Sequence, residues 1–215
     1  MFDWLVKGGP VMIPLALLSI VALAIIFERL WTLRPARFLD PAQVAVLSEL
    51  LAGRDYARAA AYCRDHEGPF TTLVGTLIEN RTAPYEELRE LLEDTGRHQL
   101  RQLQRGLPAL STVVSAAPLL GLLGTVLGMI KVFESVSLSG AVRGEQLSAG
   151  IATALITTAT GLVIAIPALF LHSYLESRAD ELLHAIEART IELAHLVRRG
   201  GEEREGENTA RRTIR

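Results

Sequence analysis

Three long stretches of the 215-residue chain contain no Asp, Glu, Lys or Arg. They cover residues 8–27, 106–130 and 146–175, and all 22 basic and 24 acidic residues lie outside them. An apolar stretch of about 18 or more uncharged residues is long enough to cross the hydrocarbon core of a bilayer as a helix. The sequence therefore predicts an all-α integral membrane protein with three transmembrane helices.

The first stretch differs from a cleaved signal peptide. A signal peptide has an apolar region of about 7–15 residues followed by small residues at the cleavage site. Here the uncharged run has 20 residues, and Phe27 is followed directly by Glu28 and Arg29. We expect residues 1–30 to contain a short N-terminal segment and a permanent first transmembrane helix.

Composition argues against several classes of protein. A net charge of −2 without a basic block argues against nucleic acid as a partner. The single cysteine, Cys63, excludes a disulfide framework and a cysteine-rich zinc site. The chain contains no Gly-rich phosphate loop, no HExxH pair and no GxSxG sequence. We therefore expect a protein that is not an enzyme and that holds no cofactor or metal.

Basic residues near the ends of the three stretches predict the orientation, because Lys and Arg are concentrated in cytoplasmic segments. One side has Lys7, Lys131 and Arg143. The other side has many more: Arg29, Arg34, Arg37, Arg97, Arg101, Arg105, Arg178, Arg189, Arg198 and Arg199. This count predicts a periplasmic N-terminus, a short periplasmic loop over 131–145 and a cytoplasmic C-terminus.

The segments outside the spans are expected to be mainly helical and cytoplasmic. Residues 31–105 form the predicted cytoplasmic helical region, and 106–175 contain the second and third spans with their loop. One long helix is expected over 84–135, with Gly106–Pro108 and Pro118 as its weak points. The third span continues as a cytoplasmic extension over 176–199, because its apolar residues keep a helical spacing. Gly200-Gly201 is expected to end it, and 200–215 is expected to be a disordered tail.

The second and third spans are rich in small and hydroxyl-bearing residues. Helical spacing groups Gly121, Thr125 and Gly128 on one stripe of the second span. On the third span it groups Ala154, Thr158, Gly161 and Ala165 on one stripe, and Gly150, Thr153, Thr157 and Thr160 on another. Close helix packing explains a single such stripe. A polar lining of a central passage explains several stripes, and it makes Thr125, Thr153 and Thr158 the candidate ion pathway. Pro118 and Pro167 are candidate helix kinks.

None of the three spans contains Asp, Glu, Lys or Arg. His172, near the expected cytoplasmic end of the third span, is the one conventional acid–base side chain within them, and a single interfacial histidine is more often structural. A charge at mid-membrane costs at least about 2.5–3.5 kcal/mol and normally marks an ion site. If this chain conducts ions, then either its hydroxyls suffice or a partner supplies the charge.

These residues resemble the MotA/TolQ/ExbB proton channel family, and within it the ExbB/TolQ branch. The resemblance rests on 117–133 (APLLGLLGTVLGMIKVF), 150–168 (GIATALITTATGLVIAIPA) and 27–30 (FERL). Thr125 and Thr158 match the family's pore threonines. Thr153 departs from the pattern, because close relatives usually carry Glu at that position.

The resemblance implies a ring-forming subunit of the bacterial inner (cytoplasmic) membrane, commonly a homopentamer. The ring would enclose transmembrane helices of a one-span partner similar to ExbD or TolR, which bears an intramembrane Asp. Proton flow would move this partner and drive a TonB-like or Tol–Pal effector in the cell envelope. Two alternatives stay open: a membrane scaffold without ion flux, and a hydroxyl-lined sodium channel or sodium-driven stator.

Overall fold

The computed structural model describes residues 8–33, 38–139 and 144–213. Within these ranges the described elements are helices and no strand is present. They divide into two compact units. The first contains α2 (Met12–Thr32), α8 (Leu107–Ser139) and the part of α9 (Gly144–Thr213) up to Glu176. The second contains α4 to α7 and α9 from Ser177 onward.

Three helices of the first unit are long and apolar enough to cross a membrane, which confirms the predicted number of spans. They are α2, α8 over Leu107–Glu134, and α9 within Leu147–Arg198. Each has an 18-residue window with a mean hydropathy of 2.1–2.2, yet only 22–28% of that window is buried inside the chain. Large apolar side chains such as Phe27 and Phe170 are 68% and 71% exposed. Surfaces of this kind require lipid or other protein around them.

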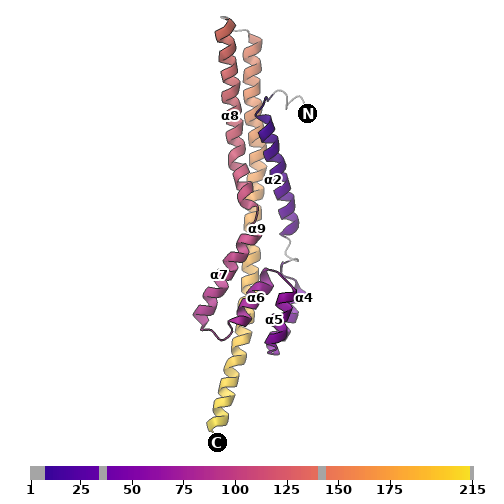
Figure 1. Ribbon diagram of the computed structural model, residues 1–215, viewed down its shortest axis with the longest axis vertical. Coiled ribbons are helices and arrows are strands. Elements are labelled where there is room, and N and C mark those ends of the chain that lie inside the picture. Colours follow the sequence, from indigo (N-terminus) through magenta and orange to yellow (C-terminus); the bar gives the residue numbers. More distant parts are fainter. Residues whose placement is uncertain (1–7, 34–37, 140–143, 214–215) are drawn as a thin grey trace. The chain divides into compact units, whose positions relative to one another are not determined.

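The helices of the first unit run side by side (Figure 1). All three meet in a small apolar cluster in which Leu15 of α2 packs with Ala117 of α8 and Ala165 of α9. Alanine at these positions lets the helix backbones approach closely.

The second unit is built from short helices with clear start signals. Asp40 caps α4 (Pro41–Ala52) by accepting a hydrogen bond from the Ala42 backbone N–H at 2.9 Å. Asp55 caps α5 (Tyr56–Asp65) in the same way, and α6 (Pro69–Glu79) begins with a proline. α7 (Tyr85–Leu103) follows Pro84 and carries Glu86 and Glu87 in its first turn, as the sequence predicts.

The core of the second unit joins α4, α5, α6 and α7 to α9 (Figure 1). Phe70, Leu73 and Leu77 of α6 are almost completely buried there, together with Ile186 of α9. The contact between α7 and α9 is close. A Cβ added at Gly96 would lie 2.6 Å from Glu187 Oε1.

Three expected boundaries differ in the structure. The single helix expected over 84–135 is divided into α7 and α8, because Gly106 has φ +86°, a left-handed conformation that interrupts the helix. The loop expected over 131–145 is shorter, since α8 continues to Ser139 and α9 begins at Gly144. No glycine or proline follows Ile130 before Gly140, so nothing in the sequence stops α8 earlier.

The third difference is at the C-terminal end. α9 continues through Gly200-Gly201 to Thr213, where a disordered tail was expected. Glycine lowers helix propensity by about 1 kcal/mol but keeps the backbone N–H that proline lacks. Residues 214–215 of the expected tail lie outside the described residues.

Candidate functional site

The candidate site lies along α8 and α9 in the first unit, where these helices pack through a seam of small residues. On α8 the seam consists of Ala117, Gly121, Gly124 and Gly128, and on α9 it consists of Gly150, Ala154, Thr157 and Gly161. A Cβ at Gly121 would lie 2.9 Å from the Thr157 carbonyl oxygen, and one at Gly161 would lie 2.5 Å from the Ala117 carbonyl oxygen. Backbone therefore lies against backbone, as in close packing of transmembrane helices.

Thr157 belongs to the centre of this seam. Its side chain is completely buried, and its hydroxyl donates to the carbonyl oxygens of Ala154 (2.9 Å) and Thr153 (3.1 Å) in alternative pairings. A Cβ at Gly124 would overlap the Thr157 side chain, with its Cβ only 2.5 Å away. Thr157 therefore packs within the subunit.

Thr158 and Thr125 lie on one flank of the seam. The Thr158 hydroxyl crosses to α8 and donates to the Gly121 carbonyl oxygen at 3.2 Å. Thr125 is four residues after Gly121, one helical turn along α8. Its hydroxyl donates to the Leu122 carbonyl oxygen at 2.7 Å. Both threonines are half-buried, so each keeps part of its surface open to something outside this chain.

Thr153 lies elsewhere around α9. At 100° per residue it is about 140° from Thr158, and about 20° from Thr160. The Thr153 methyl group is 3.8 Å from a Cβ added at Gly9, in the turn before α2. Within one subunit the structure thus brings together Thr125 and Thr158, and it places Thr153 on a different face.

The hydroxyls can solvate a cation but cannot release a proton near neutral pH. Thr153 donates to the Ala149 carbonyl oxygen (3.0 Å) and Thr160 to that of Ile156 (2.7 Å). The hydroxyl hydrogen of each threonine is therefore already bonded to a backbone carbonyl oxygen. The hydroxyl oxygen can still accept a hydrogen bond or coordinate a cation through its lone pairs. The described residues contain no group of three or more His, Cys, Asp or Glu that could hold a metal ion.

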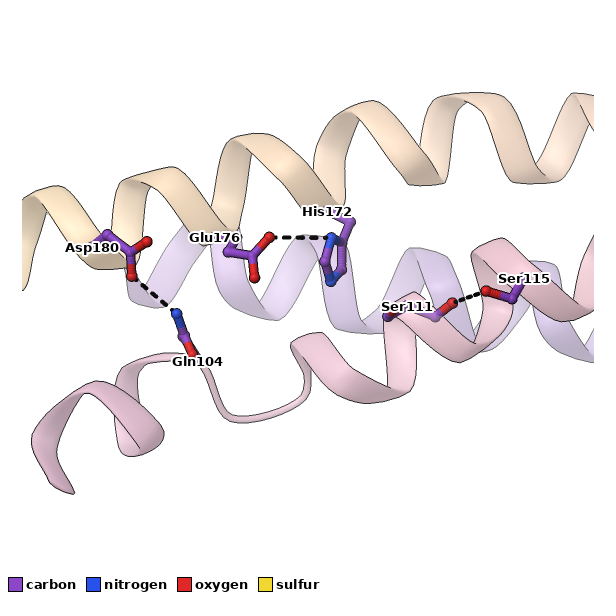
Figure 2. Close-up of polar contacts among 6 residues, drawn as sticks. All are labelled: Gln104, Ser111, Ser115, His172, Glu176 and Asp180. Carbon is purple, nitrogen blue, oxygen red and sulfur yellow. Dashed lines mark hydrogen bonds and ion pairs between the residues drawn. The ribbon is translucent and has the colours of Figure 1, made fainter. Parts of the chain in front are cut away.

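His172 marks the end of the charge-free part of α9. Its ring Nδ1 lies 3.8 Å from Glu176 Oε2, and its side chain is 17% exposed (Figure 2). On α8 the same figure shows Ser115 donating to the Ser111 carbonyl oxygen at 3.1 Å. This histidine–carboxylate pair therefore lies at the end of the charge-free part of α9, outside the seam.

The two predicted kink positions lie inside helices that are assigned without interruption. Pro118 is inside α8 and Pro167 is inside α9. The bending of either helix stays a prediction.

Gly124 is a member of the seam that was missed in the sequence-based site. The signal was present, since Ala117, Gly121, Gly124 and Gly128 follow steps of four, three and four residues, the spacing of one helix face. The predicted stripe took the four-residue step from Gly121 to Thr125 in place of the three-residue step to Gly124, and Thr125 lies on the flank.

Comparison with protein-family models gives a match over residues 66–188, more than half of the chain. The matching model is described as the MotA/TolQ/ExbB proton channel family. The matched range includes α8, the connection to α9 and the seam between them.

Curated relatives agree with this match. The chain is 34% identical to the biopolymer transport protein ExbB-like 1 of Synechocystis, over 92% of this chain and 79% of that protein. It is 40% identical to the biopolymer transport protein ExbB of Aquifex aeolicus, over 39% of this chain and 56% of that protein. It is also 40% identical to the Tol-Pal system protein TolQ of Haemophilus influenzae, over 39% of this chain and 37% of that protein.

Proposed function

This chain belongs to the MotA/TolQ/ExbB proton channel family, and we propose that it is an ExbB/TolQ-like subunit of an energy-transducing complex driven by an ion-motive force. It forms a homo-oligomeric ring, a pentamer by resemblance, in the bacterial inner membrane. The ring surrounds transmembrane helices of a one-span partner similar to ExbD or TolR. It couples proton flow to mechanical work in the cell envelope, in TonB-dependent import or a Tol–Pal type system.

One observation carries this proposal: two charge-free spans present hydroxyls on the flank of their packing seam, and no titrating acid accompanies them. Thr125 and Thr158 can stabilise a cation or accept a hydrogen bond, yet neither can carry a proton. The titrating carboxylate therefore comes from the partner's helix. A charge that crosses the membrane releases about 2.3 kcal/mol per 100 mV, so repeated crossings can drive mechanical work.

A non-conducting scaffold is the second candidate, and the contacts of Thr157 and Thr158 favour it. The first is buried in the seam and the second bonds to the opposite helix. Under this alternative, the threonines serve only to hold α8 and α9 together. A hydroxyl-lined sodium channel or sodium-driven stator requires that the ring conduct sodium with its own side chains.

Ion flux into vesicles tests the proposal. The full chain is reconstituted with and without an ExbD/TolR-like one-span protein, and proton and sodium fluxes are measured under an imposed potential. We expect proton flux only with the partner. Sodium flux by the ring alone supports the sodium channel, and absence of flux with the partner present supports the scaffold.

Substitutions at Thr158 separate conduction from packing. Thr158→Val removes the hydroxyl and its bond to the Gly121 carbonyl oxygen, whereas Thr158→Ser keeps both. We expect Thr158→Val to lower flux at least tenfold while the ring stays assembled, and Thr158→Ser to retain most of the flux. Dissociation of the Thr158→Val ring assigns the residue to packing.

A further inference from the structure

Three arginines form a basic edge at the end of the second unit that adjoins α8 in sequence. Arg97 and Arg101 are four residues apart on α7, and Arg105 continues this spacing in the turn after it. All three side chains are exposed, whereas Gln99 and Leu103 on another face of α7 are buried. The basic edge is thus presented outward by a helix that is anchored through its other side.

The charges of the basic edge are not neutralised within the described part of the chain. None of its three guanidinium groups pairs with a carboxylate there. Arg101 donates to His98 Nδ1 at 3.3 Å, and an accepting nitrogen of a histidine ring brings no negative charge.

Three carboxylates of the same unit, on α7 and α9, already have other partners. Glu93 pairs with Arg89 at 2.9 Å, and Arg178 pairs with Glu181 at 2.8 Å. Asp180 accepts a hydrogen bond from Gln104 at 3.0 Å (Figure 2). The basic edge is therefore available to an anion from outside the chain.

Charge is distributed unevenly along α7. The acidic residues of this helix lie in its first half: Glu86, Glu87, Glu90, Glu93 and Asp94. The basic edge occupies the second half and the following turn. An anionic surface is therefore attracted by one end of α7 and repelled by the other.

The attracted end is the one joined to the membrane. Arg105 precedes Leu107, the first residue of α8, by two residues, which span at most about 7 Å. With α8 as a membrane span, Arg105 is expected in the headgroup region at its end, and Arg101 is expected one helical turn away. Guanidinium groups bind phosphate oxygens through paired, charge-assisted hydrogen bonds.

We propose that the basic edge of Arg97, Arg101 and Arg105 binds the phosphate headgroups of anionic phospholipids at the membrane surface. This contact fixes the end of α7 beside the bilayer, next to the α7–α8 break. The proposal rests on the membrane location included in the proposed function, and it does not depend on ion conduction.

Lipid binding by the purified full chain tests this proposal. The chain is held in a neutral detergent and titrated with phosphatidylglycerol or with phosphatidylcholine of the same acyl chains. Retained lipid is counted by native mass spectrometry, and the unfolding temperature is followed in parallel. The test variant is R97Q/R101Q/R105Q. The matched control R58Q/R64Q/R81Q removes the same charge from exposed arginines elsewhere in the second unit.

We expect the wild type and the control to prefer phosphatidylglycerol, and the test variant to lose this preference by roughly fivefold per arginine. An unchanged preference in the test variant overturns the proposal. Competition by millimolar inorganic phosphate also overturns it, because the basic edge then binds a soluble anion. Disassembly of the test variant with or without lipid overturns it as well, because the basic edge then binds a carboxylate of another protein chain. If the test variant loses its lipid preference but keeps its ion flux, the lipid proposal is supported independently of conduction. If the wild-type ring binds phosphatidylglycerol but shows no ion flux, only the proposed function is contradicted.

Discussion

At the scale of single residues, Gly161 is the position where the α8–α9 seam tolerates least. A Cβ there would lie 2.5 Å from the Ala117 carbonyl oxygen and 3.2 Å from Gly121 Cα, and backbone atoms cannot swing aside. Gly161→Ala should therefore separate the helices and lower the free energy of unfolding by about 1–3 kcal/mol. Unfolding in detergent micelles measures this loss.

Two other glycines provide the controls for Gly161. A Cβ at Gly144 meets nothing within 4 Å, so Gly144→Ala should leave stability nearly unchanged. A Cβ at Gly96 would meet the Glu187 carboxylate, the flexible end of a side chain that can rotate away. Equal losses in all three variants would contradict the assignment of Gly161 to a rigid backbone contact.

Cys63 provides a second prediction at this scale. Burial raises the pKa of its thiol to about 11 from 9.0, although the positive charge of Arg64 acts in the opposite direction. The reactive thiolate is therefore about a hundredfold rarer at pH 8 than in an unfolded chain. Maleimide labelling should be correspondingly slow in the folded protein and should rise about tenfold per pH unit up to pH 10.

The same pKa shift gives a sign for the pH dependence of stability. The folded-state pKa exceeds the unfolded value, so the neutral thiol stabilises the fold fully below pH 9, and this contribution is lost between pH 9 and about 11. Cys63→Ser should abolish both the labelling and this part of the pH dependence. Rapid labelling at pH 7 in the folded state would show that the thiol is not shielded.

The residue scale also shows where sequence reasoning stops. Helical spacing predicted small and hydroxyl-bearing faces on α8 and α9, because spacing alone determines which residues share a stripe. It grouped Thr153, Thr157 and Thr160 together, yet Thr157 is buried against Gly124 while the other two are half-buried. The difference in burial among these threonines depends on where α8 contacts α9. The spacing of residues along α9 alone does not indicate where this contact lies.

At the scale of elements, the break between α7 and α8 depends on Gly106. Its φ of +86° is readily adopted by glycine and costs other residues about 1–2 kcal/mol. A Cβ there would make only ordinary contacts of 3.6 Å with Arg29 Nε and Ile25 Cγ2, so the backbone and not crowding limits substitution. Gly106→Val should therefore lower stability by at least that amount.

Asparagine serves as the control for Gly106, because it enters the left-handed region more easily than other residues do. Gly106→Asn should recover most of the stability that Gly106→Val loses, as measured by unfolding in the same detergent. If both substitutions have no effect, the chain forms the single helix over 84–135 that the sequence alone suggested.

The membrane spans were predictable and this break was not, for different physical reasons. A span must be apolar and continuous by itself, because lipid offers no partner for charges or backbone groups. The three uncharged stretches therefore led directly to α2, α8 and α9. The conformation of Gly106 is adopted beside Ile25 and Arg29 of α2, a contact between distant segments that no local pattern records.

At the scale of the whole molecule, topology is the property on which ion coupling depends. Most of the basic residues that flank the spans belong to α7, the connections around it and the later part of α9. Such residues remain on the cytoplasmic side during insertion. With three spans, we therefore expect a periplasmic N-terminus, a periplasmic 140–143 connection and a cytoplasmic C-terminal end.

Single cysteines can test this topology, because the chain has only Cys63 and Cys63→Ser gives a clean background. Ala188 is an exposed residue of α9 in the second unit, so a cysteine there is accessible to a reagent on its own side. In intact cells with a permeabilised outer membrane, a membrane-impermeant maleimide should label Arg143→Cys and should leave Ala188→Cys unlabelled. After inner-membrane disruption both should label fully, which controls for access to each thiol. Labelling of Ala188→Cys in intact cells would show that the chain has the opposite orientation in the membrane. The second unit would then lie outside the cytoplasm, and the proposed coupling to a periplasmic effector would have to be abandoned.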